Sequence, residues 1–195
     1  MKVLLHTCCG PCASACVPAL REQGHDVTLF FSNSNIDTET EFEKRLDNAR
    51  RLADADGVEL VVDAYNHDDW LENVAKGFEN EPEKGARCAR CFRYNLARTA
   101  ACAAARGHDM FTTSLTVSPH KVSRMVFEAG TDAAWSVSAK ACGGSAVSAP
   151  KFLPVDFKKQ DGFLLSLRRA GELGLYRQSY CGCEFSRRDS AAVRD

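Results

Sequence analysis

Cysteines are the residues whose type and spacing carry the clearest chemical signal. The chain of 195 residues has ten of them. Seven fall in three short clusters: Cys8, Cys9 and Cys12; Cys88 and Cys91; Cys181 and Cys183. Thiolates bind zinc and iron–sulfur clusters, and closely spaced thiols also exchange electrons. Because the clusters lie far apart in the sequence, any site that joins them has to be assembled by the fold.

The first cluster, with the sequence CCGPC at residues 8–12, is compatible with three kinds of site. Cys9 and Cys12 resemble the thioredoxin dithiol, but a thioredoxin fold places more chain ahead of that motif. Structural zinc uses ligands two to four residues apart, so the neighbours Cys8 and Cys9 fit it poorly. An iron–sulfur cluster has separate iron corners and accepts neighbouring thiolates more readily. We therefore favour an iron–sulfur site, with a non-catalytic zinc-binding or thioredoxin-like thiol protein as the alternative.

Apolar runs predict four strands, at residues 2–6, 27–31, 58–62 and 110–112. Helical patterns lie at residues 13–22, 38–55, 97–106, 118–129 and 163–173, and the third helix is expected to begin near Cys91. Strands that alternate with helices form a parallel sheet with right-handed crossovers. We therefore predict one α/β domain over residues 1–195, with a Rossmann-like, doubly wound parallel sheet. The small-residue-rich segment 136–150 is expected to be a loop.

Sites in such folds lie at the carboxyl ends of the strands, where Cys8, Asn33 and Thr113 fall. In Rossmann-like ATP pyrophosphatases and tRNA thiolases, which have the adenine nucleotide alpha hydrolase-like fold, a glycine- and serine-rich loop after the first strand binds pyrophosphate. Here that loop is HTCCGPC, at residues 6–12. A prolyl nitrogen cannot donate a hydrogen bond, and thiolates repel phosphate. The sequence thus predicts a metal pocket in the place of a nucleotide pocket.

The formal net charge of −1 gives no overall attraction to nucleic acid or membrane, but the charges are segregated. Residues 36–83 hold 5 basic and 15 acidic side chains, residues 84–130 hold 8 and 2, and residues 151–195 hold 9 and 6. A fold that joins the last two segments would have a basic face. The sequence has no 18-residue apolar run and no secretory signal, so we expect a cytoplasmic protein without a membrane span.

Five segments, spread over nearly the whole chain, resemble the cobalamin-independent epoxyqueuosine reductases of the QueH type. They are LLHTCCGPC at 4–12, NSNI at 33–36 followed by EFEKR at 41–45, RCARCF at 87–92, FTTSL at 111–115 followed by SPHK at 118–121, and GLYRQSYCGC at 174–183. Two departures from the family pattern concern other segments. Asp37-Thr38 stands where a proline is expected nearby, and residues 136–150 differ from the family's usual linker before its last strand.

The resemblance implies an oxidoreductase that carries out the last step of queuosine biosynthesis. In that reaction the epoxide of epoxyqueuosine, at the tRNA wobble position, is reduced by two electrons to the cyclopentene and water. The family carries a [4Fe–4S] cluster, and the matching ligand positions are Cys8, Cys9, Cys88 and Cys91. By the same resemblance Cys181 and Cys183 form a redox-active pair. Cys12 is the spare thiolate for a second, mononuclear iron.

The partners implied are a tRNA with a GUN anticodon that carries epoxyqueuosine, and an electron donor that the sequence does not identify. Arg90, Tyr176 and Arg177 stand beside cysteine motifs. Guanidinium and aromatic groups together suit an extruded base and its phosphates, so we expect these three to bind substrate. The remaining conspicuous residues are expected to have packing roles: His6 as a hydrogen-bonded core histidine, Cys16 and Cys102 in helices, and Cys142 as an incidental thiol.

Overall fold

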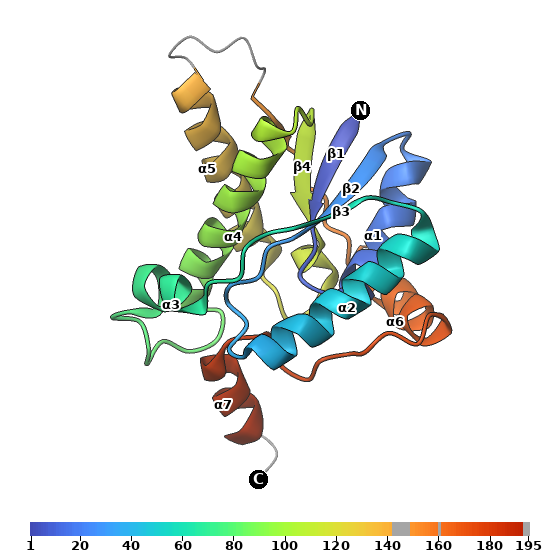
Figure 1. Cartoon of the computed structure of the whole chain (residues 1–195). Coiled ribbons are helices and arrows are strands. Elements are labelled where there is room, and N and C mark those ends of the chain that lie inside the picture. The colour runs from blue at the N-terminus through green and yellow to red at the C-terminus, as the bar shows by residue number, and fades with distance from the viewer. Residues whose placement is uncertain (142–148, 160, 193–195) are drawn as a thin grey trace.

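A computed structural model describes residues 1–141, 149–159 and 161–192, so Cys142 lies outside the described residues. Its centre is a five-stranded sheet of order β3-β2-β1-β4-β5, in which every pair is parallel (Figure 1). The strands are β1 Lys2–His6, β2 Asp26–Phe31, β3 Leu60–Val62, β4 Met110–Thr113 and β5 Lys151–Phe152. The predicted Rossmann-like parallel sheet is confirmed.

Seven α-helices accompany the sheet in the described part of the chain. They are α1 Gly10–Glu22, α2 Glu39–Asp56, α3 His67–Trp70, α4 Ala86–Ala105, α5 Ser123–Ala141, α6 Gly162–Glu172 and α7 Glu184–Ala192. A π-helical turn, Leu71–Ala75, follows α3, and a 3-10 turn, Ser114–Val117, follows β4. None of the described helices combines the length and the apolar character that crossing a membrane requires.

Helices cover both faces of the sheet, which explains why β1 is a nearly continuous apolar run. Successive side chains of a strand point to opposite faces. Val3 and Leu5 accordingly pack into a core cluster with α1 and α2, while Leu4 packs into a second cluster with α4 and α5. Figure 1 shows α4 and α5 on one side of the strands and α1, α2 and α6 on the other.

Three helix boundaries differ clearly from the sequence-based prediction. The helix expected to begin near Cys91 begins at Ala86, so Cys88 and Cys91 both lie in its first two turns. The helix expected from residue 118 begins at Ser123, because a 3-10 turn and a further turn fill the chain after β4. It then continues to Ala141, so the first part of the predicted loop 136–150 is helical. Alanine has the highest helix propensity, and no glycine or proline interrupts residues 131–141.

The strand order places β1 at the centre of the sheet. The chain changes direction across the sheet between β1 and β4, which makes this pair the topological switch point. From β1 the chain proceeds to β2 and β3 on one side, and it returns to β4 and β5 on the other. Ligands of open α/β sheets bind in the crevice at such a point, beyond the carboxyl ends of the strands. The segment between α6 and α7 passes across this end of the sheet (Figure 1).

Candidate metal centre and thiol pocket

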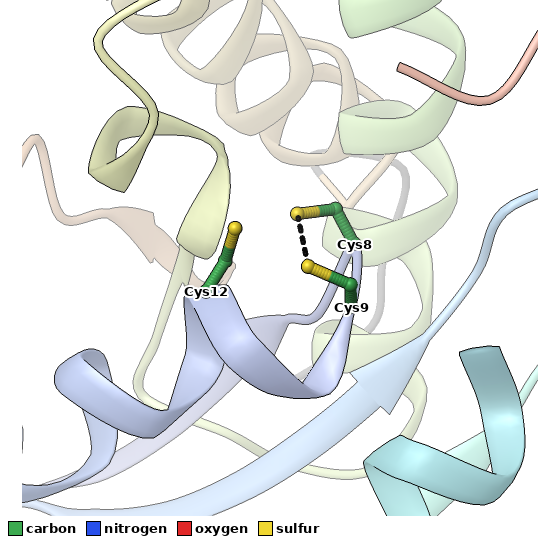
Figure 2. A group of neighbouring side chains, drawn as sticks. All are labelled: Cys8, Cys9 and Cys12. Atoms are coloured by element: carbon green, nitrogen blue, oxygen red, sulfur yellow. Dashed lines mark hydrogen bonds between the residues drawn. The ribbon is translucent and has the colours of Figure 1, made fainter. Parts of the chain in front are cut away.

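Three thiols meet at the carboxyl end of β1. The sulfur atoms of Cys8, Cys9 and Cys12 all lie within 4.8 Å of one another (Figure 2). The Sγ atoms of Cys8 and Cys9 are 3.9 Å apart. Within the described ranges, no other set of three or more histidine, cysteine or acidic residues is gathered so closely. We call Cys8, Cys9 and Cys12 the three-thiol group.

The start of α1 positions this group. Cys9 is the N-cap residue, and Pro11 occupies the first helical turn, where a missing N–H costs no hydrogen bond. Gly10 is required because a Cβ atom there would lie 2.5 Å from the backbone oxygen of Asn48 in α2. The close approach of α1 to α2 therefore fixes where Cys9 and Cys12 point.

The third thiol, that of Cys8, is held by Ser114, which directly follows β4. The backbone N–H of Cys8 donates to Ser114 Oγ at 3.1 Å, and the Ser114 hydroxyl donates to Cys8 Sγ at 3.3 Å. Beside them the fully buried His6 contacts Thr113 Oγ1 at 2.9 Å through Nδ1 and the Ser32 carbonyl oxygen at 3.2 Å through Nε2. Burial lowers the pKa of His6 to about 4, so the ring is neutral near pH 7. The prediction of a hydrogen-bonded core histidine is confirmed.

The electrostatics of the three-thiol group favour a bound cation. Hydrogen bonds from Cys12 and Cys8 hold the pKa of the Cys9 thiol well below its ordinary value. Bonds to Cys8 and Cys9, together with burial, raise the pKa of the Cys12 thiol. Two protonated neighbours can thus support one thiolate, whereas three buried thiolates would repel one another. A metal cation replaces the protons and removes that repulsion, so this donor set fits a soft metal such as iron or zinc.

A second set of thiols comes from the other two cysteine clusters. Cys88 and Cys91 on α4, and Cys181 and Cys183 before α7, line one small cavity with Lys121. All four are free thiols. The structure therefore brings the second and third sequence clusters together.

A larger cavity of about 340 Å³ connects the two sets. The three-thiol group forms part of its lining, and Cys181, which also lines the small cavity, forms another part. The remaining polar lining includes His120 and Lys121 from the turn before α5, and Arg177 from the segment before α7. The basic segments 84–130 and 151–195 therefore meet at this cavity.

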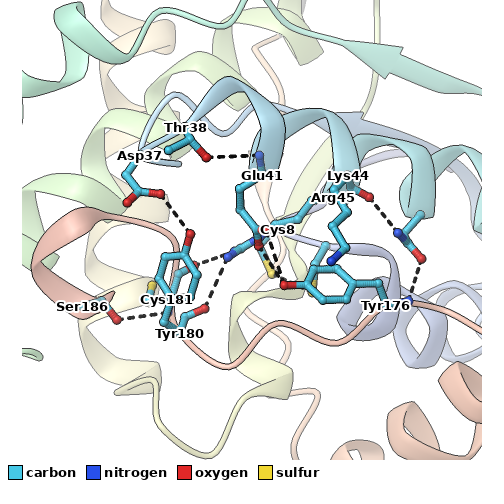
Figure 3. A network of polar contacts seen from close by, with 12 residues as sticks. Cys8, Asp37, Thr38, Glu41, Lys44, Arg45, Tyr176, Tyr180, Cys181 and Ser186 are labelled. Carbon is cyan, nitrogen blue, oxygen red and sulfur yellow. Dashed lines mark hydrogen bonds and ion pairs between the residues drawn. The ribbon is translucent and has the colours of Figure 1, made fainter. Parts of the chain in front are cut away.

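A buried arginine fixes the segment that carries Cys181. Arg45 of α2 is 2% exposed, and it donates to the Cys181 carbonyl oxygen at 2.8 Å and to Glu41 at 2.7 Å. The Tyr180 hydroxyl donates to Asp37 at 2.9 Å. Figure 3 shows these contacts, which join α2 and the residues before it to the C-terminal segment. These contacts hold the backbone that carries Cys181 in place without involving its thiol.

The glycine between Cys181 and Cys183 also has a structural reason. Gly182 has a φ of 150°, which few other residues adopt, and a Cβ there would lie 2.9 Å from Asn35 Nδ2. Its carbonyl oxygen accepts a hydrogen bond from the Asp37 N–H at 3.0 Å. The backbone conformation and the close packing thus require a glycine between the two cysteines.

Comparison with known proteins identifies the family. The sequence profile described as "Epoxyqueuosine reductase QueH" matches residues 3–189. The chain belongs to the QueH family. One QueH relative, from Streptococcus pyogenes serotype M1, is 34% identical over 191 residues, covering 95% of this chain and 70% of the relative. Another, from Thermotoga maritima, is 33% identical over 187 residues and covers 94% and 89%. The resemblance drawn from the motifs is confirmed.

QueH members are named as reductases, so the expectation of an oxidoreductase is confirmed and the non-catalytic alternative is set aside. Among solved structures, the U34-tRNA thiolase NcsA from Methanococcus maripaludis with its [4Fe-4S] cluster has a similar fold. The TM-score is 0.52 at 14% identity, and the match covers 100% of this chain and 64% of the thiolase. At that identity the likeness concerns the fold alone, and it agrees with the predicted adenine nucleotide alpha hydrolase-like class.

The QueH-type ligand set predicted from the sequence is divided between two places. Cys8 and Cys9 belong to the three-thiol group together with Cys12, while Cys88 and Cys91 line the small cavity. A common cluster for Cys8, Cys9, Cys88 and Cys91 stays a prediction. Cys16 and Cys102 pack against the two core clusters, as expected.

The three predicted substrate-binding residues have different surroundings. Arg177 is exposed and lines the larger cavity. The Lys44 ammonium lies 3.5 Å from the centroid of the Tyr176 ring, and Tyr176 does not line that cavity. Arg90 donates to the carbonyl oxygens of Val74 at 3.1 Å and Asn73 at 2.6 Å, so its guanidinium is engaged within the protein. The substrate roles of all three stay predictions.

Sequence reasoning missed three residues that the structure makes prominent: Arg45, Ser114 and Lys121. Each lies in a segment that resembles the QueH family, but none was given a role. Their partners are 136, 106 and 60 positions away in the sequence, respectively, so local patterns carry no signal for these contacts.

Proposed function

We propose that the protein reduces the epoxide of epoxyqueuosine at the wobble position of tRNA, producing queuosine in the last step of its biosynthesis. The observation that carries this proposal is the cavity of about 340 Å³ lined by both the three-thiol group and Cys181. Membership of the QueH family gives the activity its name. The reaction consumes two electrons and two protons, and the epoxide oxygen leaves as water.

The cofactor proposed for this reaction is a [4Fe–4S] cluster on Cys8, Cys9, Cys88 and Cys91, with Cys12 available to a second iron. The gathering of three soft donors within 4.8 Å supports a metal at this position. When bound, the cluster supplies one-electron transfer, and an adjacent iron supplies Lewis acidity. The Ser114 hydroxyl, by donating to Cys8 Sγ at 3.3 Å, would stabilise the negative charge on that ligand.

Cys181 and Cys183 are proposed as the redox pair. Two thiols that form one disulfide release two electrons and two protons, which is the requirement of the epoxide reduction. Cys181 lines the same cavity as the three-thiol group, which supports electron supply at this site. A Cys-Gly-Cys disulfide closes a tight ring, and strained disulfides are readily reduced again. An electron donor that reduces the disulfide would complete the cycle.

The substrate is proposed to be a tRNA with a GUN anticodon, whose modified base enters the cavity. Pockets that hold small ligands have volumes of about 300–1,000 Å³, so a cavity of about 340 Å³ suits one base with its cyclopentane substituent. A base in an anticodon loop can be turned out of its stack at small cost. Arg177, which is exposed and lines the cavity, is suited to the adjoining phosphates. A tRNA substrate and reduced thiols both favour a cytoplasmic location.

The direct test is mass spectrometry of the modified nucleoside. Protein purified anaerobically with iron, and then reduced, is incubated with tRNA that carries epoxyqueuosine. We expect the nucleoside to lose one oxygen atom, and we expect protein without iron to leave it unchanged. An unchanged epoxide in the presence of iron-loaded protein and excess reductant would contradict the proposal.

A further inference from the structure

A lysine ammonium lies against one thiol of the Cys181 and Cys183 pair. The Nζ atom of Lys121 is 2.7 Å from Cys181 Sγ, within hydrogen-bonding distance. The Lys121 side chain is 11% exposed, so this contact is largely shielded from water. The lysine comes from the turn between β4 and α5, far in sequence from the thiol that it meets.

A shielded ammonium requires a nearby negative charge. Among the described residues, the ammonium contacts Cys181 Sγ at 2.7 Å and Glu83 Oε1 at 3.9 Å, and Cys88 also contributes to the electrostatic field at this position. The sulfur is the nearer of the two, and the glutamate carboxylate is 36% exposed and screened by water. Cys181 Sγ is therefore the closest partner of the ammonium.

Cys183 has the opposite surroundings. It is 9% exposed and packs against Trp70, Val74 and Ala75 in an apolar cluster. Cys183 lines the small cavity but not the larger one, whereas Cys181 lines both. The two thiols of the pair are thus chemically unequal.

We propose that Lys121 holds Cys181 as the thiolate of the reduced pair, so that Cys181 is the reactive sulfur facing the substrate cavity. The proposal rests on the proposed function for its catalytic meaning, because that function assigns the pair its redox role. The contact between Nζ and Sγ and the unequal surroundings of the two thiols stand independently of the substrate.

The proton balance of the redox step follows from this arrangement. The reduced pair consists of the Cys181 thiolate, the Cys183 thiol and the Lys121 ammonium. On oxidation a bond forms between the two sulfur atoms and two electrons leave. One proton comes from the Cys183 thiol and one from the Lys121 ammonium. The two electrons and two protons convert the epoxide to the cyclopentene and water. Lys121 therefore stores the proton that Cys181 lost and donates it to the epoxide oxygen during the reduction.

Thiol alkylation tests the proposal without substrate. The reduced, iron-loaded protein is treated with iodoacetamide at pH 7, and the labelling rates of Cys181 and Cys183 are followed by peptide mass spectrometry. In the wild-type protein we expect Cys181 to react at least about tenfold faster than Cys183, because the thiolate is the nucleophile. Equal rates, or a faster Cys183, would overturn the proposal.

Variants then separate charge from structure. In a Cys183→Ser background, Lys121→Gln keeps a hydrogen-bond donor but removes the charge, and we expect Cys181 labelling to slow about tenfold. Lys121→Arg keeps the charge and is expected to restore most of the rate. The matched control is Lys158→Met, since Lys158 donates to the Lys121 carbonyl oxygen at 3.1 Å and to Ser123 Oγ, and it makes no hydrogen bond to a thiol in the described part of the chain. We expect its rate to stay within about twofold of the parent.

Unchanged labelling in Lys121→Gln, or an equal loss in Lys158→Met, would overturn the role of the lysine charge. Neither result requires tRNA, so the outcome is distinguishable from a failure of the proposed function. Failure of that function would appear as an intact epoxide with the labelling pattern preserved.

Discussion

At the scale of single residues, the two groups of thiols have different surroundings. The three-thiol group is compact, and a bound cation would relieve the repulsion between its thiolates. Cys181 is instead paired with an ammonium and faces the cavity. The same substitution, cysteine to serine, should therefore have a different effect in each group.

We predict that Cys8→Ser will lose most of the bound iron, because it removes one of three closely spaced donors and the partner of Ser114. Cys181→Ser should retain the iron content and the visible absorbance, yet abolish multiple turnover. Iron analysis and the nucleoside assay, applied to both variants, check this prediction. Loss of iron from Cys181→Ser would make that residue a ligand and contradict the assignment.

Much of the residue-level account was accessible from sequence. The spacing of Cys8, Cys9 and Cys12 predicts that their thiols share a pocket, and the structure places them together. The position of Lys121 beside Cys181 was not predictable, because a lysine in a polar turn has no periodicity and its partner lies 60 positions away. For Arg90 the sequence position was a poor guide to its contacts. Its place beside a cysteine motif suggested contact with phosphate, but its guanidinium donates to two backbone carbonyl oxygens.

At the scale of elements, the packing of α1 on α2 sets the geometry of the three-thiol group. We predict that Gly10→Ala will destabilise the protein by about 1–3 kcal/mol, because the new Cβ would lie 2.5 Å from the backbone of Asn48, which cannot move alone. The matched control is Gly171→Ala in α6, where a Cβ meets nothing within 4 Å. That control should stabilise the protein by about 0.5–1 kcal/mol.

Chemical denaturation of both variants measures these changes. A Gly10→Ala protein as stable as the wild type, with its iron content intact, would mean that α1 can shift and that its start does not position the thiols.

A second element-scale prediction concerns the segment before α7. Arg45→Met removes the donor that binds the Cys181 carbonyl oxygen and leaves Glu41 without its ion-pair partner, so we expect stability to fall by about 3 kcal/mol. Hydrogen exchange should become faster in residues 174–183 in particular. Arg50→Met, on the same helix but 52% exposed and 3.8 Å from Glu43, should cost less than about 0.5 kcal/mol.

Equal exchange in residues 174–183 of both variants would show that Arg45 does not hold the segment.

The elements themselves illustrate what local patterns can and cannot predict. The buried run 2–6 predicted β1 with correct bounds, because both faces of a central strand are covered. β5 has only two residues, too few for any period, and was missed. α7 was also missed, since its polar sequence is ordered by tertiary contacts such as the Arg187–Asp37 ion pair at 2.9 Å.

At the scale of the whole molecule, the fold joins two basic segments that the sequence keeps apart. His120 and Lys121 come from residues 84–130, Arg177 comes from residues 151–195, and all three line the larger cavity. The strand order explains the position of the first two, because β4 lies beside β1 and the chain that follows β4 therefore starts next to the thiols. Charge segregation predicted a basic face, but only the topology tells where it lies.

We predict that binding of a GUN-anticodon tRNA weakens steeply with salt, because the association releases counterions from the phosphates. Arg177→Ala should lower affinity and reduce the slope of log affinity against log salt by about one. Arg50→Ala, which removes an exposed charge from the acidic segment 36–83, should leave the slope unchanged. Filter-binding titrations at several salt concentrations measure both, and a salt-independent affinity would contradict this cavity as the tRNA site.

We propose that the three-thiol group and the Cys181 and Cys183 pair together reduce the epoxide in one cavity. A single-turnover reaction tests it most directly. Pre-reduced, iron-loaded protein is freed of reductant and mixed anaerobically with excess epoxyqueuosine tRNA. Loss of oxygen from the nucleoside and loss of free thiols from the protein are then measured together. The account predicts one oxygen lost per protein and two thiols lost, both of them at Cys181 and Cys183. Oxygen loss with all thiols still free would contradict the redox role of the pair, and thiol oxidation without oxygen loss would contradict the reduction itself.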